Sequence, residues 1–85
     1  MSEINPILLS SAEELLTGTP KSVRLVFYTI KKSNTPLKVG DIEEITRLTG
    51  RTVRKALRRL YSLKLVIKVP DLTDMRSHFL QLAIT

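Results

Sequence analysis

Apolar residues recur three or four positions apart in the segment that follows Pro20, a spacing typical of one face of a helix. They are Val23, Val26, Phe27 and Ile30. Because proline suits the first position of a helix, we predict a helix from about Pro20 to Lys32. Leu25 and Tyr28 fall on another side of this helix, so a second surface, either an earlier helix or another subunit, must cover them.

An earlier helix is predicted over residues 5–17, because Asn5 can cap it, a proline follows, and Gly18 can end it. Ser11 and Glu14 have the spacing of a capping box, so a later start is also consistent with the sequence. Beyond the second helix, residues 33–36 indicate a turn and residues 37–39 a short strand.

Two short helices joined by a tight turn are predicted next. The first covers about residues 40–48, and its buried side is expected to consist of Ile42, Ile45 and Leu48. Thr49 and Gly50 form the turn, and Thr49 is expected to cap a helix over residues 50–64.

The C-terminal part of the chain predicts a β-hairpin. Residues 65–69 are rich in branched side chains, residues 70–74 indicate a turn, and residues 77–84 read as a second strand. This order of elements predicts a mainly α protein with a small β-hairpin (α+β), the winged helix-turn-helix. The 85 residues are expected to form one domain, with N-terminal helices at about 5–33, the helix-turn-helix at about 40–64 and the wing at about 65–84.

The positive charge of the chain indicates the class of partner rather than the fold. The chain has 14 Lys and Arg against 8 Asp and Glu, a net charge of +6, which suggests a polyanionic partner. No acid occurs between Glu44 and Asp71, and the basic residues of that interval are Arg47, Arg51, Arg54, Lys55, Arg58, Arg59, Lys64 and Lys68.

A helix over residues 50–64 separates these charges from its apolar residues, at about 100° per residue. One arc holds Val53, Ala56, Leu57, Leu60 and Leu63, and the opposite arc holds Arg51, Arg54, Lys55, Arg58, Arg59 and Ser62. Such a division is what a groove-reading helix needs. A merely solvated face is the alternative, but it would normally mix acids with its cations.

Positions along this helix suggest two roles. Residues in the first turns usually approach base edges, so the candidate base readers are Arg51, Thr52, Arg54 and Lys55. Arg58 and Arg59 lie further along and are expected to meet phosphates. In the hairpin, Arg76 can enter a minor groove or simply pair with Asp74, and Lys68 is a candidate phosphate contact.

Several classes of protein are disfavoured. The chain has no cysteine and one histidine, which argues against a disulfide or a zinc site. It has no apolar run of about 18 residues, no signal-peptide pattern, no nucleophile beside a base and no phosphate loop. We therefore expect a non-enzymatic protein of the cytoplasm, associated with the nucleoid, with no metal or cofactor.

Residues 37–82 resemble the MarR-type winged-helix regulators. The stretch from Asp41 to Leu60 is similar to the second and third helices of that family, and residues 63–68 are similar to its entry into the wing. Residues 71–77 resemble its acidic wing tip. The resemblance implies that Arg76 is the wing arginine that enters the minor groove and that Asp74 is its supporting carboxylate.

The sequence departs from this family at its ends. Family members usually carry long terminal helices that build a dimer and an effector pocket, whereas the printed sequence ends at Thr85. We therefore expect no C-terminal helix, no obvious small-molecule ligand, and a homodimer through the N-terminal helices. Its candidate contacts are Leu8, Leu9, Leu15, Leu16, Leu25 and Tyr28.

These features favour a sequence-preferring binder of double-stranded DNA, a transcriptional regulator acting as a dimer on a pseudo-palindromic site. Three alternatives stay open at this point. They are a winged-helix module that binds an acidic protein, a nucleoid protein with little sequence preference, and an RNA-binding protein.

Overall fold

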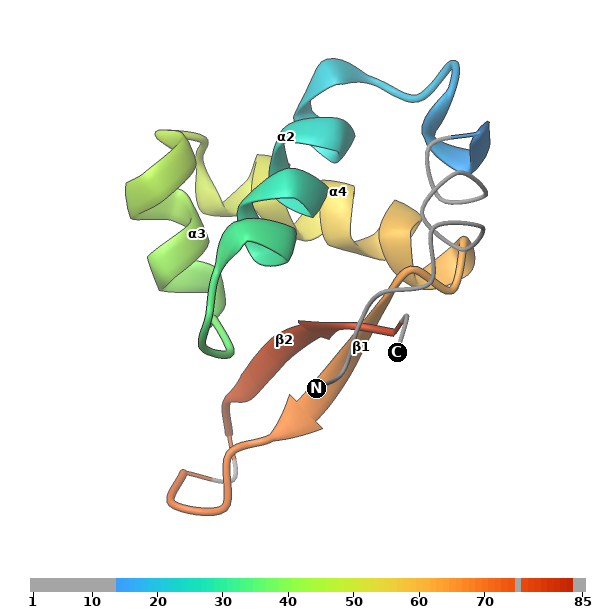
Figure 1. The fold of residues 1–85 in the computed structure, drawn as a ribbon. Helices are drawn as coiled ribbons and strands as arrows, with labels where there is room; N and C mark the ends of the chain where they lie inside the picture. Colours follow the sequence, from blue (N-terminus) through green and yellow to red (C-terminus); the bar gives the residue numbers. More distant parts are fainter. Residues whose placement is uncertain (1–13, 75, 84–85) are drawn as a thin grey trace.

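The computed structural model describes residues 14–74 and 76–83, in which helices pack over a two-stranded hairpin (Figure 1). The described elements are α2 (Lys21–Lys32), α3 (Val39–Thr46), α4 (Gly50–Ser62), β1 (Val66–Pro70) and β2 (His78–Leu82). This order confirms the predicted fold class, a mainly α protein with a wing hairpin.

Only the end of the predicted first helix falls within the described residues. Residues 14–16 are helical, and Gly18 follows with a φ of +84°, the left-handed conformation in which glycine commonly ends a helix. The hydroxyl of Thr19 donates to the carbonyl of Leu16 at 2.5 Å, and Leu16 is buried in the core. Asn5 and Ser11, the two alternative starts, lie outside the described residues.

The predicted stripe of α2 is buried, and α2 begins one residue later than predicted, with Pro20 just before it. It packs on the apolar arc of α4, so that one core forms from Val23, Val26, Phe27, Ile30, Val53, Ala56, Leu57 and Leu60, with residues of the hairpin below. Leu63, predicted on the same arc of α4, is half-buried against this core.

Two predictions around α3 are wrong. Its buried side does not include Ile45, which is 60% exposed, because this short helix is covered on only one flank, where Ile42 enters the core. Arg47, with a φ of 63°, ends the helix before Leu48. The strand predicted over residues 37–39 shrinks to a single bridge between Leu37 and Leu80, since Val39 already begins α3.

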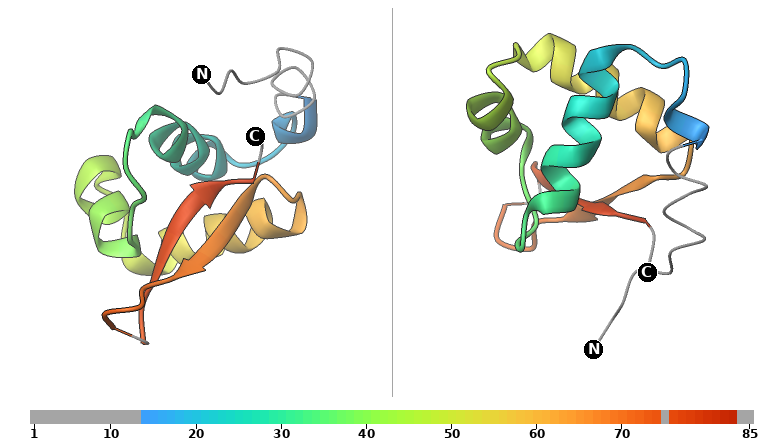
Figure 2. Two further views of the ribbon diagram at one scale, coloured as in Figure 1. Left: turned by 60° about the horizontal axis from the view of Figure 1, so that its bottom comes forward. Right: turned by 45° about the horizontal axis from the view of Figure 1, so that its top comes forward.

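The hairpin has a regular antiparallel register, from Val66 opposite Leu82 to Pro70 opposite His78. Its inner side contributes Val66 and Leu80 to the core. The turn over residues 71–77 projects beyond the helices, as the views in Figure 1 and Figure 2 agree. The base of the wing is therefore packed on the core, whereas its turn extends beyond the helices.

One ion pair joins this wing to α3. The ammonium of Lys38, the residue that precedes α3, lies 2.7 Å from Asp71 Oδ2. The backbone N–H of Lys38 donates to Asp41 Oδ2 at 3.0 Å, and its ammonium also lies 5.1 Å from the centre of the Phe79 ring. Lys38 thus starts α3 with its backbone and holds the base of the wing with its side chain.

Asp71 is buried and uses both of its carboxylate oxygens. The N–H and hydroxyl of Thr73 donate to Oδ1 at 2.9 and 2.6 Å, while Lys38 occupies Oδ2. Together the hydrogen bond from Lys38 and those from Thr73 hold the pKa of Asp71 well below its ordinary value of 3.8. The same hydrogen bond raises the pKa of Lys38 above 10.5.

The corrected burial of α3 leads to a stability prediction. Leu60→Ala should lower the free energy of unfolding by about 2–5 kcal/mol, because it opens a cavity in the core. Ile45→Ala should change it by no more than about 0.5 kcal/mol, because Ile45 contacts solvent. Urea unfolding of both variants beside the wild type measures the difference. A large loss from Ile45→Ala would contradict the exposure described above.

The Lys38–Asp71 pair leads to a second prediction, on pH. Because the pKa of Asp71 is lower in the folded than in the unfolded protein, its contribution is fully present above about pH 4 and disappears as the pH falls through the folded-state pKa. Asp71→Asn should remove this part of the acid-side loss of stability. Urea unfolding at a series of acidic pH values measures it, with Asp74→Asn on the same turn as the control. An unchanged pH dependence in Asp71→Asn would refute the role of this carboxylate.

Candidate nucleic-acid interface

Most of the predicted site residues lie on α4, and Thr49 caps the start of this helix. The hydroxyl oxygen of Thr49 accepts from the N–H of Thr52 at 3.2 Å, and the Thr49 hydroxyl donates to the Thr52 hydroxyl at 3.0 Å. A Cβ at Gly50 would lie 3.1 Å from Oε1 of Glu43 and 3.3 Å from a guanidinium nitrogen of Arg54. Both atoms are the ends of flexible side chains, so the carboxylate of Glu43 and the guanidinium of Arg54 both lie close to the start of α4.

The outer face of α4 is cationic and exposed. It carries Arg51, Arg54, Lys55, Arg58 and Arg59. Within the described part of the chain, none of these five side chains forms an ion pair. Their charge is therefore available to an external anion.

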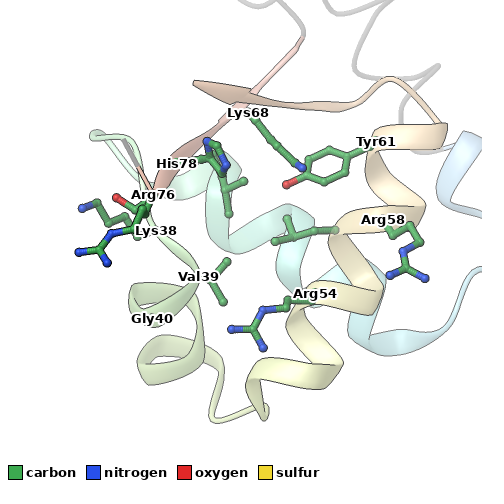
Figure 3. A pocket seen from close by; sticks show the side chains of 12 residues that line it. Lys38, Val39, Gly40, Arg54, Arg58, Tyr61, Lys68, Arg76 and His78 are labelled. Carbon is green, nitrogen blue, oxygen red and sulfur yellow. The ribbon is translucent and has the colours of Figure 1, made fainter. Parts of the chain in front are cut away.

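A groove of about 650 Å³ lies beside this face, between α4, the start of α3 and the wing. It brings together four of the predicted site residues, namely Arg54, Arg58, Lys68 and Arg76. Figure 3 shows that they come from both walls, with Arg54 and Arg58 on the helix and Lys68 and Arg76 on the wing side. Two stretches separated in sequence thus form one basic surface.

Among the residues that line the groove but were not predicted as part of the site, three have ionisable side chains: Lys38, Tyr61 and His78. A signal for Tyr61 was present in the sequence, because seven residues place it within about 20° of Arg54 on the helix. Its ring lies 5.2 Å from the ammonium of Lys68, a cation–π contact that Figure 3 shows across the groove. Burial raises the pKa of Tyr61, so its hydroxyl keeps its proton and can donate a hydrogen bond.

The other predicted residues of α4 do not line this groove. Arg51, Lys55, Arg59 and Ser62 are exposed on α4 but are not among the residues that line the groove. The Ser62 hydroxyl donates to the carbonyl of Arg59 at 2.8 Å, and Thr52 is half-buried in the cap. The predicted site is therefore broader than the groove and covers the outer surface of α4 as well.

At the tip of the wing, the side chain of Arg76 is 95% exposed. Its backbone N–H donates to Asp74 Oδ1 at 3.1 Å, and its Nε lies 3.8 Å from the same oxygen. The two sequence-based interpretations of Arg76 are therefore compatible, because the long contact to Asp74 orients the guanidinium without covering it.

Among the described residues, no group of three or more His, Cys, Asp and Glu side chains is placed to hold a metal ion. In the same part of the chain, no helix has the length and apolar character needed to cross a membrane.

Comparisons with known proteins place this fold. No family model matches the sequence, and a search of curated proteins gives no match. The fold is similar to the adhesin competence repressor from Streptococcus pyogenes, with a TM-score of 0.70, 17% identity, and coverage of 89% of this chain and 54% of that one.

Two further solved structures are similar. A mutant of MepR from S. aureus bound to an oligodeoxyribonucleotide has a TM-score of 0.66 and 25% identity over 89% of this chain and 57% of that chain. The PcaV transcriptional regulator from Streptomyces coelicolor in complex with its natural ligand has a TM-score of 0.70 and 21% identity over 96% of this chain and 67% of that chain.

The chain spans little more than half the length of the first two of these proteins. These neighbours are MarR-family winged-helix transcriptional regulators. The described residues therefore have the winged helix-turn-helix fold of the family that the sequence resembles.

Proposed function

We propose that this protein binds double-stranded DNA with a sequence preference and regulates transcription. The observation that carries the proposal is the face of exposed, unpaired cations on α4, which continues through the groove to Arg76 on the wing. In this arrangement α4 enters a major groove, which is wide enough for one helix, and the wing tip reaches the adjacent minor groove.

Each cation has a proposed role in this complex. The first turns of α4 present Arg51, Thr52, Arg54 and Lys55 to base edges, where an arginine can pair with both major-groove acceptors of guanine. Phosphates are contacted by Arg58, Arg59, Ser62 and Lys68, which lie further along the helix or across the groove. The hydroxyl of Tyr61 adds a neutral donor between these cations.

The comparisons support this proposal at the level of the fold. One structural neighbour is bound to an oligodeoxyribonucleotide, and the neighbours are transcriptional regulators rather than enzymes. By analogy with these neighbours, the proposed place of action is the nucleoid in the cytoplasm. Another neighbour is in complex with its natural ligand, so the expected absence of a small-molecule ligand here stays a prediction.

We also propose a homodimer through the N-terminal part of the chain. Of the predicted contacts, Leu16 is buried in the core of its own subunit and cannot serve. Leu15 and Leu25 are 46% and 42% exposed, and Tyr28 is half-buried, so these three side chains are accessible. Leu8 and Leu9 lie outside the described residues.

DNA binding should depend steeply on salt. Three phosphate contacts from one protomer, by Arg58, Arg59 and Lys68, predict a loss of affinity of about fortyfold for a fourfold rise in salt concentration. Fluorescence anisotropy with a labelled duplex measures this, and an acidic protein in place of the duplex is the control. A failure to bind any duplex at low salt would favour the protein-interaction module and reject the proposal.

Two variants then separate sequence-preferring from sequence-blind binding. Arg54→Ala should cost about 1–3 kcal/mol on a preferred site selected from a random duplex library and should relax its preference. Arg58→Ala should weaken binding to all sequences similarly and lower the salt dependence. If both variants lose affinity equally on every sequence, the protein is a nucleoid protein with little sequence preference.

The dimer is tested by sedimentation at micromolar concentration. Leu25→Glu should shift the protein toward a monomer, because it places a charge on the proposed interface. Ile45→Glu is the matched control, because Ile45 is also an exposed apolar residue but lies on α3. A wild-type protein that sediments as a monomer contradicts the dimer directly.

A further inference from the structure

Leu72 is the most exposed large hydrophobic residue in the described part of the chain, at 84%. It follows the buried Asp71 in the wing turn. Single exposed apolar residues are common on protein surfaces, but this one stands on a projecting turn that also carries the exposed Arg76, so it is accessible to whatever the wing contacts.

The turn that presents Leu72 is held by hydrogen bonds on both sides. The N–H of Asp71 donates to the carbonyl of Ser77 at 3.2 Å, and the N–H of Asp74 donates to the carbonyl of Asp71 at 3.1 Å. The Asp71 carboxylate binds Thr73 on the far side of Leu72 and is itself held by Lys38. Leu72 therefore stands between two anchored residues, and placing it in a partner requires little ordering of the backbone.

The charges around the tip indicate which partner fits. Arg76 shares this turn and is 95% exposed, whereas the one exposed carboxylate of the described turn, Asp74, faces Arg76. The groove behind the tip adds Lys68 and Arg54. An anionic partner fits this surface, and in the DNA complex proposed above the wing tip lies over the minor groove next to α4. Apolar side chains that enter minor grooves act as wedges that partly unstack a base step.

We propose that Leu72 is a minor-groove wedge, which enters beside Arg76 and opens a base step so that the wing favours flexible DNA. This inference rests on the proposed DNA-binding function and adds a second source of sequence preference to it. The preferred steps are pyrimidine–purine steps such as TA, because they unstack most easily. Arg76 contributes the opposite preference, since a narrow A-tract groove attracts an arginine.

Two duplexes of equal length and equal A·T content test this proposal with the full chain. One carries TA steps under the wing, and the other carries an A-tract at the same place, so that charge and minor-groove acceptors match while deformability differs. A 2-aminopurine at the step under the wing reports unstacking by a rise in fluorescence. Leu72→Ser removes the wedge, and Ile67→Ser, an exposed apolar residue on β1 away from the tip, is its matched control.

The wild type and Ile67→Ser should bind the TA duplex several-fold more tightly than Leu72→Ser does and should raise the 2-aminopurine fluorescence. Leu72→Ser should lose this rise and should keep its affinity for the A-tract duplex. Equal behaviour of Leu72→Ser and the wild type, or an equal loss on both duplexes, overturns the wedge while the proposed function stands. A wild type that binds neither duplex overturns the proposed function together with the wedge.

Discussion

The ion pair between Lys38 and Asp71 connects the two halves of the interface. Lys38 precedes α3, and Asp71 belongs to the wing turn, so this contact fixes the turn relative to the helix-turn-helix. The nearby bridge between Leu37 and Leu80 adds two backbone hydrogen bonds, at 2.7 and 3.4 Å, in the same region. Without these contacts the wing turn, which carries Arg76, would lose its link to the start of α3.

The hydrophobic core explains why a single ion pair is sufficient to position the wing turn. The inner residues of the hairpin, Val66 and Leu80, pack with the apolar arc of α4 below α2. This burial sets the position of the two strands. The ion pair and hydrogen bonds of Asp71 then orient only the wing turn. Every buried side-chain nitrogen and oxygen in the described residues has a hydrogen-bond partner, so the anchoring network costs the core no unsatisfied group.

Features that rest on a periodic spacing of apolar residues could be predicted from the sequence. Features that depend on a single contact between distant residues could not. The stripes of α2 and α4 are periodic and predict the helices, and the branched residues on either side of a turn predict the hairpin. Ile45 was misplaced because periodicity identifies an apolar face but not how much of that face a neighbour covers. Asp71 was interpreted as a tip acid, since nothing local shows that Lys38, more than thirty residues earlier, would reach it.

Three of the carboxylates near the candidate interface are engaged by groups other than the arginines of α4. Positive residues attract acids during folding as well as afterwards, and an acid next to α4 would compete with any external polyanion. Here Asp71 is taken by Lys38, Asp74 faces Arg76, and Asp41 accepts from the backbone at the start of α3. Acids placed in this way support the turns and the helix start without neutralising the arginines of α4. The contacts of the wing turn therefore affect the candidate interface in two ways. They position the wing side of the groove, and they hold Asp71 and Asp74 away from the arginines of α4.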